Sequence, residues 1–294
     1  MATTSGSSDV AAFRRALRRG AESIARPLPW VGHVDPWAIL VSEVMLQQTK
    51  TSRVIDPWHR FLEAFPTPAA CARAPLARVL QLWSGLGYHR RAKALHECAR
   101  AVCERHDGRV PSTVAELRAL PGVGEYTAHA VASFAFAAPV AVLDTNVGRV
   151  LARAITNRTL SVREARIVAG ELLPRHDVAR FNQSMLDLGA QFCKAVARCE
   201  GCPVARVCRW HGEGGVDPAP RSAGVSRPQS AFEGSDRQLR GRILAQLRAH
   251  AVTRAELDAI TGEVDRVRGE RVLRSLLVDG LVEDTGALVQ LASH

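Results

Sequence analysis

The 294-residue chain lacks long apolar runs and contains few lysines. No segment reaches the roughly 18 to 20 consecutive apolar residues that a bilayer-spanning helix needs. Residues 1–9 form a polar tail without the apolar core of a secretory signal, so we expect a cytoplasmic protein that makes no membrane contact. Only three lysines occur (Lys50, Lys93 and Lys194), which excludes a lysine nucleophile from the long stretch between the last two.

Strand patterns are also scarce, because alternation of apolar and polar residues is almost never sustained. Helix start signals recur instead. Asp35 and Pro36 offer an N-cap and a first-turn proline ahead of residues 37–48, and Thr113 with Glu116 forms a capping box. Residues 181–190 are typical of a further apolar helix. These patterns predict a mainly α fold.

Changes in composition divide the chain into four parts. We expect a disordered tail over residues 1–9 and a helical domain over 10–210. Residues 211–235 are rich in Gly, Pro and Ser and are predicted to be a linker that buries little. Residues 236–294 regain helical periodicity, with a third helix over 264–278, and end in two short strands about a turn, so they resemble a winged helix. Such a module could contact DNA or serve only for packing.

Charge and composition favour a nucleic-acid partner. The net charge is +10, the sequence pI is about 10, and 47% of the residues are apolar. A sizeable core is therefore expected, and the basic surface should attract a polyanion, of which nucleic acid is the commonest for a soluble basic protein.

Four of the seven cysteines crowd into sixteen residues with the spacing C-x5-C-x2-C-x5-C: Cys193, Cys199, Cys202 and Cys208. We call residues 193–208 the cysteine loop. The short gaps disfavour disulfides between neighbours, whereas four thiolates from one loop can hold a zinc ion or a [4Fe-4S] cluster. The other three, Cys71, Cys98 and Cys103, are expected to be free thiols that fill apolar gaps.

Two glycine turns are candidates for DNA contact. The segment LPGVG at residues 120–124 lies between two predicted helices, and Gly122 and Gly124 permit a tight turn whose backbone amides can bind a phosphate. A second turn, GLGY at residues 85–88, is followed by four basic-type residues and could push a side chain into a base stack.

Two carboxylates are candidates for cleaving a glycosidic bond. Glu43 lies in a segment that is apolar nearly all round, and burial there favours the protonated form that a general acid needs. Asp144 follows an apolar run and could cap a helix or serve chemistry. Together with the hairpin and the cysteines, they suggest hydrolysis through an oxocarbenium-like state.

Seven segments between residues 10 and 210 resemble, in order, the MutY adenine DNA glycosylases of the endonuclease III superfamily. They are LPW (28–30), SEVMLQQT (42–49), WSGLGYHRRAKALH (83–96), LPGVGEYTA (120–128), VLDTNVGRVLAR (142–153), RFNQSMLDLGA (180–190) and the cysteine loop. The resemblance implies a helix-hairpin-helix glycosylase fold with a [4Fe-4S] cluster on the four cysteines, and it makes zinc the less favoured metal.

The resemblance also implies the reaction and the roles of residues. Adenine mispaired with guanine or 8-oxoguanine would be flipped out of double-stranded DNA and excised. Glu43 would protonate the departing base, Asp144 would stabilise the sugar cation, and Asn146 would position Asp144. Tyr126 stands where bifunctional relatives carry a Schiff-base lysine, so a monofunctional enzyme is expected. Residues expected to enter the base stack are Gln48, Thr49, Leu86 and Tyr88, and those expected to line the adenine pocket are Trp30, Leu46 and Asp187.

The chain departs from the family pattern at several points. The first cysteine gap is five residues instead of six, Val31 replaces the usual arginine after LPW, and Thr145 replaces the glycine after the catalytic aspartate. The tail after Asp236 is too short and too helical for the Nudix-like domain of long MutY enzymes. A thymine glycosylase acting on G:T mispairs and a non-catalytic protein that binds damaged DNA remain alternatives. We expect a monomer associated with the nucleoid.

Overall fold

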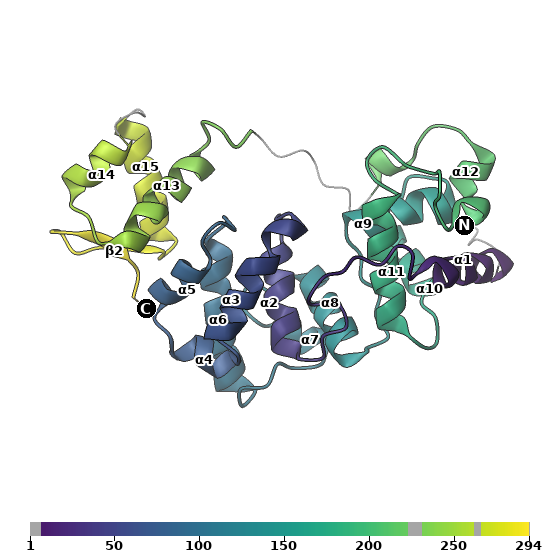
Figure 1. Cartoon of the computed structure of the whole chain (residues 1–294), viewed down its shortest axis with the longest axis horizontal. Coiled ribbons are helices and arrows are strands. Elements are labelled where there is room, and N and C mark those ends of the chain that lie inside the picture. Colours follow the sequence, from purple (N-terminus) through teal and green to yellow (C-terminus); the bar gives the residue numbers. More distant parts are fainter. Residues whose placement is uncertain (1–6, 223–230, 262–265, 294) are drawn as a thin grey trace. The chain divides into compact units, whose positions relative to one another are not determined.

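The computed structural model describes residues 7–222, 231–261 and 266–293. The fold is mainly helical, as the sequence predicts (Figure 1). Contacts divide the chain into two units, one built from residues 1–34 and 125–228 and the other from residues 35–124 and 229–294. No helix in the described ranges is both long and apolar enough to cross a bilayer.

The first unit packs its helices around one apolar core. Its elements are α1 (Ser7–Gly20), α8 (Glu125–Phe136), α9 (Thr145–Val150), the π-helical η2 (Leu151–Thr156), α10 (Val162–Glu171), α11 (Val178–Gln191), η3 (Ala205–Val207), α12 (Arg209–Glu213) and η4 (Ala219–Arg221). Phe13 and Leu17 of α1 meet Leu151 and Met185 in this core. Burial of such large side chains stabilises a fold by about 1.5–3 kcal/mol each.

The second unit contains the most apolar helix of the chain. Its elements before the linker are α2 (Pro36–Leu46), η1 (Thr51–Arg53), α3 (Ile55–Ala64), α4 (Pro68–Arg73), α5 (Leu76–Leu82), α6 (Arg90–Arg105) and α7 (Val114–Arg118). As predicted, Asp35 caps α2 by accepting a hydrogen bond from the Trp37 amide, and Pro36 opens the helix. Nine of the eleven α2 residues are buried, so this helix forms the centre of its unit.

The carboxyl-terminal module belongs to the second unit. It consists of α13 (Asp236–Ala249), α14 (Arg254–Thr261), α15 (Arg266–Val278) and the antiparallel strands β1 (Val282–Asp284) and β2 (Val289–Leu291). The predicted helices and strand pair are therefore confirmed, except that the first two residues of the third predicted helix lie outside the described residues. The module contacts α5, and Lys93 of α6 donates to the carbonyl of Asp279 at 2.9 Å.

Part of the segment expected to be a linker folds against the first unit. Pro218, Ala219 and Ser222 are buried, and Asp217 forms a 2.5 Å ion pair with the buried Arg153. Composition did not predict this, because the buried residues are small and one charged partner lies more than sixty positions earlier in the chain. Residues 223–230 lie outside the described residues.

Candidate active site in two units

Asp144 and Asn146 meet at the start of α9 in the first unit. Oδ1 of Asp144 accepts a hydrogen bond from the Val147 amide at 2.7 Å, and Oδ2 accepts one from the Asn146 side-chain amide at 2.6 Å. Burial raises the pKa of Asp144, while these hydrogen bonds and the charge of Arg149 oppose the increase. Asp144 thus caps a helix and also presents a partly buried carboxylate, so the two roles weighed from the sequence are compatible.

Arg149 connects this carboxylate to the cysteine loop. Its Nη2 atom donates to Oδ1 of Asn146 at 2.7 Å and to the Gly189 carbonyl at 3.1 Å, and its Nε atom donates to the Cys193 carbonyl at 2.6 Å. A chain of hydrogen bonds therefore runs from Asp144 through Asn146 and Arg149 to the first cysteine.

Gly189 allows α11 to lie this close to α9. A Cβ atom built on Gly189 would stand 2.6 Å from the Cβ atom and 2.7 Å from the backbone carbonyl of Asn146. Backbone atoms cannot move aside as a flexible side chain can, so only glycine fits without displacing Asn146.

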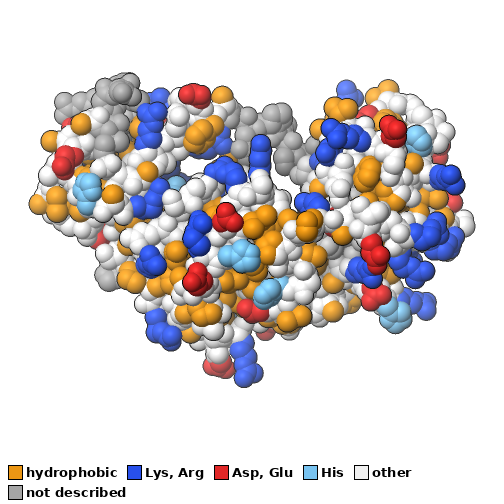
Figure 2. Space-filling model, in the orientation of Figure 1, with side chains coloured by type: hydrophobic (Ala, Val, Ile, Leu, Met, Phe, Trp, Pro, Cys, Tyr) orange, Lys and Arg blue, Asp and Glu red, His pale blue; other side chains and the backbone are white. Residues whose placement is uncertain are grey.

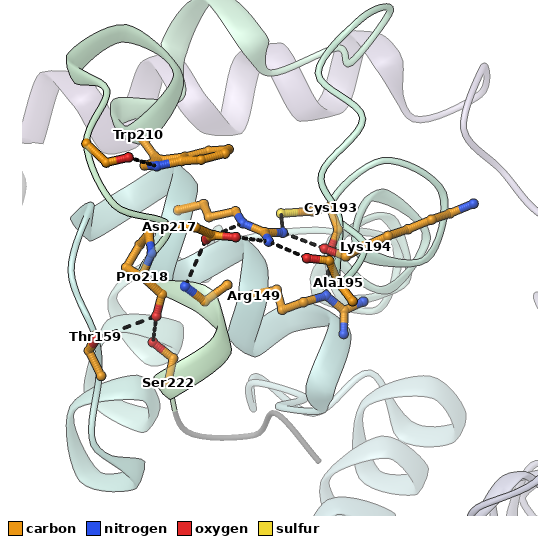
Figure 3. Close-up of polar contacts among 12 residues, drawn as sticks. Arg149, Thr159, Cys193, Lys194, Ala195, Trp210, Asp217, Pro218 and Ser222 are labelled. Atoms are coloured by element: carbon orange, nitrogen blue, oxygen red, sulfur yellow. Dashed lines mark hydrogen bonds and ion pairs between the residues drawn. The ribbon is translucent and has the colours of Figure 1, made fainter. Parts of the chain in front are cut away.

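The four cysteines of the cysteine loop line one small cavity of the first unit. Arg153, 1% exposed, lies beside them and donates to the carbonyls of Lys194 and Ala195 at 2.6 and 3.0 Å (Figure 3). Arg153 also approaches the Cys193 sulfur at 3.4 Å and lies over the Trp210 ring. One buried arginine thus fixes the first part of the loop.

The loop thiols are partly shielded from solvent. Burial raises the pKa of Cys202 to about 11, and it also raises that of Cys193, where Arg153 and Arg149 partly offset the effect. Within the described ranges, no three Cys, His, Asp or Glu side chains are grouped closely enough to hold a single metal ion. Cys71 and Cys98 are buried free thiols elsewhere, as predicted, and burial raises the pKa of each to about 12.

Asp187 and Trp30 are further predicted site residues in the first unit, and both are buried. Oδ1 of Asp187 accepts hydrogen bonds from Nε of Arg26 at 2.6 Å and from the Gln183 side chain at 3.0 Å. Arg26 is only partly exposed in this ion pair. The guanidinium therefore holds the Asp187 carboxylate in a fixed direction.

Glu43 lies in the second unit, on the centre of α2, and is 4% exposed. Its neighbours along the helix are apolar on almost every side, as the sequence predicts. Leu46, the last residue of α2, is only partly buried. The helix therefore carries its single acidic residue inward and ends at a residue that retains access to solvent.

Arg91 joins the two turns of the second unit that are expected to meet DNA, residues 47–49 (the glutamine turn) and residues 85–88 (the tyrosine turn). Its Nη1 atom donates to the carbonyls of Met45 at 2.8 Å and Gln47 at 2.5 Å. Its Nη2 atom donates to Thr49 Oγ1 at 3.0 Å and to the Gly87 carbonyl at 3.1 Å. Burial lowers the pKa of Arg91 to about 10, so the guanidinium still carries its charge at neutral pH.

The tips of both turns have unusual backbone conformations. Gln48 and Tyr88 have φ angles of +54° and +48°, in the left-handed region that residues other than glycine rarely adopt. Gln48 is exposed and Thr49 is partly exposed. Leu86, in contrast, is 2% exposed, so its insertion into a base stack would require the tyrosine turn to open.

Tyr88 also contacts the carboxyl-terminal module within the same unit. Nη1 of Arg237 donates to the Tyr88 hydroxyl at 2.7 Å, and the Arg91 guanidinium lies 5.4 Å from the centre of the Tyr88 ring. Asp279 of the module also pairs with Arg90 at 2.6 Å. The module therefore supports the tyrosine turn.

The predicted hairpin lies between α7 and α8. Gly122 has a φ angle of +73°, and a Cβ atom there would stand 2.7 Å from the Cβ of Ala94. Gly124 is exposed. Tyr126, in the first turn of α8, packs in part against the core of the first unit.

The sequence analysis missed four arginines that hold the predicted site residues. Arg26, Arg91, Arg149 and Arg153 each reach at least one partner distant in the chain. Their neighbours in the motifs were recognised, but an arginine among 39 basic residues carries no local signal that it is buried.

Comparison with known proteins is consistent with this arrangement. Residues 41–174 match the HhH-GPD superfamily of base excision DNA repair proteins. The chain is 46% identical over 267 residues to the adenine DNA glycosylase of Mycolicibacterium smegmatis, covering 88% of this chain and 89% of that protein. It is 39% identical over 216 residues to the adenine DNA glycosylase of Homo sapiens, covering 68% of this chain and 40% of the human protein.

Solved structures show the same fold. A thermostable thymine-DNA glycosylase superposes with a TM-score of 0.64 at 26% identity, covering 70% of this chain and 98% of that one. Endonuclease III in a trapped covalent intermediate with DNA gives 0.58 at 26% identity, covering 69% and 97%. With the catalytic motifs in place and close relatives over most of its length, the chain belongs to the MutY-type adenine DNA glycosylases of the HhH-GPD superfamily.

Proposed function

We propose that this enzyme removes adenine mispaired with guanine or 8-oxoguanine and leaves the sugar-phosphate strand uncut. Adenine excision in base excision repair follows from the family. The observation that supports the proposed chemistry is the partly buried carboxylate of Asp144, which accepts hydrogen bonds from the Asn146 side chain and the Val147 amide. A carboxylate fixed in this way can stabilise a sugar cation without reorganising during the reaction.

In the proposed reaction, Glu43 donates its proton to N7 of the flipped adenine, which weakens the bond between that base and the sugar. The bond then breaks, its electron pair leaves with adenine, and positive charge develops on the sugar. Asp144 stabilises this charge until water adds to the anomeric carbon and releases a proton. Asn146 holds Asp144 in the required direction.

The remaining predicted residues would bind the substrate. Trp30, Leu46 and Asp187 line the adenine pocket in this proposal, and the hairpin glycines Gly122 and Gly124 bind a phosphate of the backbone. The gap that the flipped base leaves in the base stack would be filled by Gln48, Thr49 and Tyr88. Leu86 joins them only when the tyrosine turn opens.

We infer that the four cysteines hold a [4Fe-4S] cluster. All four line one cavity of the first unit. Four thiolates from one loop can hold either a zinc ion or a [4Fe-4S] cluster, and the resemblance to the MutY enzymes favours the cluster. When bound, the cluster would cross-link the loop.

The carboxyl-terminal module is proposed to act as a winged helix that binds DNA phosphates. Two arginines on α15, Arg268 and Arg271, pair with Asp236 at 2.7 and 3.0 Å. The exposed Arg274 makes no such pair within the described residues, so it is the better candidate for phosphate contact.

The proposal is tested with a panel of duplexes that carry A or T opposite G, 8-oxoguanine or C. Single-turnover excision is measured by cleavage of the product strand in alkali. We expect excision of A opposite G and 8-oxoguanine, and little cleavage without alkali. Excision of T opposite G instead would identify a thymine glycosylase, and binding without excision would identify a non-catalytic protein.

A further inference from the structure

A second cavity in the first unit is lined by none of the predicted site residues. Its volume is about 370 Å³, and it lies between α1 and the start of α11. Basic side chains dominate its lining: Arg14, Arg15, Arg18, Arg175, His176 and Arg180. Asp177 is the one acidic residue among its lining residues. On the face drawn in Figure 2, Lys and Arg side chains gather over the unit that carries α1.

One of these arginines is bound to backbone carbonyls, whereas three others are exposed and could bind a ligand. Arg14 donates to the carbonyls of Glu171, Leu172 and Leu173 at 2.8 to 3.0 Å and so forms a fixed wall. Arg15, Arg18 and Arg175 are exposed, and no hydrogen bond or ion pair within the described residues engages them.

The bottom of the cavity is apolar. Leu17 and Ala21 are 1% and 8% exposed, and Phe181 contributes a partly buried ring. A ligand that fits this lining carries several negative charges at one end and a planar or apolar group at the other. The volume lies in the range of small-molecule sites, roughly 300–1,000 Å³.

The arginines of the lining indicate which anions fit. Every basic side chain of the lining except His176 is an arginine. A guanidinium donates two parallel hydrogen bonds and matches a phosphate or carboxylate bidentately, and several guanidinium groups together suit closely spaced phosphates. The acidic side chain of Asp177 disfavours a ligand with only one negative charge.

We propose that this cavity is a second, phosphate-binding site of the enzyme. Its ligand presents adjacent phosphate groups, as a nucleoside triphosphate or the backbone of duplex DNA does. The cavity shares no lining residue with the cysteine cavity and contains none of the groups that hold Asp144. The proposal therefore rests on residues that the proposed excision reaction does not use.

The test compares two double variants of the full chain that each lose two exposed arginines. Arg15→Ala with Arg18→Ala removes two charges from the cavity. Arg19→Ala with Arg163→Ala removes two exposed charges of the same unit, one from α1 and one from α10, that do not line it. ATP and inorganic tripolyphosphate binding are measured by titration calorimetry, and binding of a fully paired duplex is measured by fluorescence anisotropy.

We expect the cavity variant to lose at least about tenfold in affinity for one of these phosphate probes, and the control variant to lose less than threefold. A loss confined to ATP and tripolyphosphate identifies a free phosphate ligand. A loss confined to the duplex, or ATP that competes with the duplex for wild type, identifies the DNA backbone. Equal behaviour of the two variants with all three probes overturns the proposal.

Discussion

The two candidate catalytic carboxylates are held in opposite ways in the two units. Asp144 begins a helix, accepts hydrogen bonds from Asn146 and Val147, and lies near the charge of Arg149. Glu43 lies in the middle of a helix in which nine of eleven residues are buried, most of them apolar. Burial favours the protonated form of a carboxyl group, and hydrogen bonds donated to it favour the ionised form. The proposed reaction uses Asp144 to stabilise charge and Glu43 to donate a proton.

In both units, however, arginine side chains hold the loops by donating hydrogen bonds to backbone carbonyls. In the first unit, Arg149 and Arg153 donate to backbone carbonyls of the cysteine loop. In the second, Arg91 donates to backbone carbonyls of the glutamine turn and the tyrosine turn. A guanidinium has five donors in a rigid plane, so one side chain can satisfy several carbonyls from different segments.

Replacement of Glu43, the proposed proton donor, should have the largest effect and therefore tests the comparison of the two carboxylates most directly. We expect Glu43→Gln to reduce the single-turnover excision rate by about 10²- to 10⁴-fold, because the amide keeps the volume of the side chain but has no proton to transfer. Binding of an A:8-oxoguanine duplex, measured by anisotropy, should change less than threefold. A rate within about tenfold of wild type would show that Glu43 is not the acid.

Replacement of Asp144, the proposed stabiliser of the sugar cation, should have the next largest effect. Asp144→Asn preserves the cap but removes the negative charge, and we expect the excision rate to fall by about 10²- to 10³-fold. Asp9→Asn, an exposed acid in the same unit, provides the matched control. Should Asp144→Asn retain near wild-type excision, the proposed division of roles between the carboxylates would be wrong.

The Arg91→Lys variant tests whether the second unit needs a guanidinium to hold its turns, as the first unit uses Arg149 and Arg153 for the cysteine loop. Lysine keeps the charge but cannot bridge the glutamine and tyrosine turns with a rigid fork. We expect excision to slow by about tenfold and duplex binding to weaken, with a loss of roughly 1–3 kcal/mol in unfolding free energy from carbonyls left unsatisfied. Arg100→Lys on the exposed side of α6 should leave all three measurements unchanged.

The smallest expected effect is a change in the pH profile of Asn146→Ala. Burial raises the pKa of Asp144, and the Asn146 hydrogen bond lowers it by stabilising the ionised form. Excision needs ionised Asp144, so its rate should fall as the pH falls through this pKa. Removing the hydrogen bond raises the pKa further, and the acid limb of the single-turnover profile should move to higher pH. An unmoved limb would mean that Asp144 does not control it.

Much of the local structure could be predicted from the sequence. The Asp35 cap, the Thr113 cap and the α11 helix follow from short-range signals that the structure confirms. The folding of residues 217–222 could not be predicted in the same way, because it depends on an ion pair with Arg153 across the chain. The burial of Leu86 depends likewise on packing that the GLGY turn does not encode locally.

The sequence by itself determined which residue types are available for chemistry: the two carboxylates, the four spaced cysteines and the two glycine turns, together with a lack of lysine near the hairpin. These are properties of spacing and composition, which can be read directly from the sequence. Only the tertiary structure decided what holds them. It placed Gly189 against Asn146 and selected four arginines from many to bridge distant segments. Such choices depend on three-dimensional proximity and burial, which neighbouring residues in the sequence do not specify.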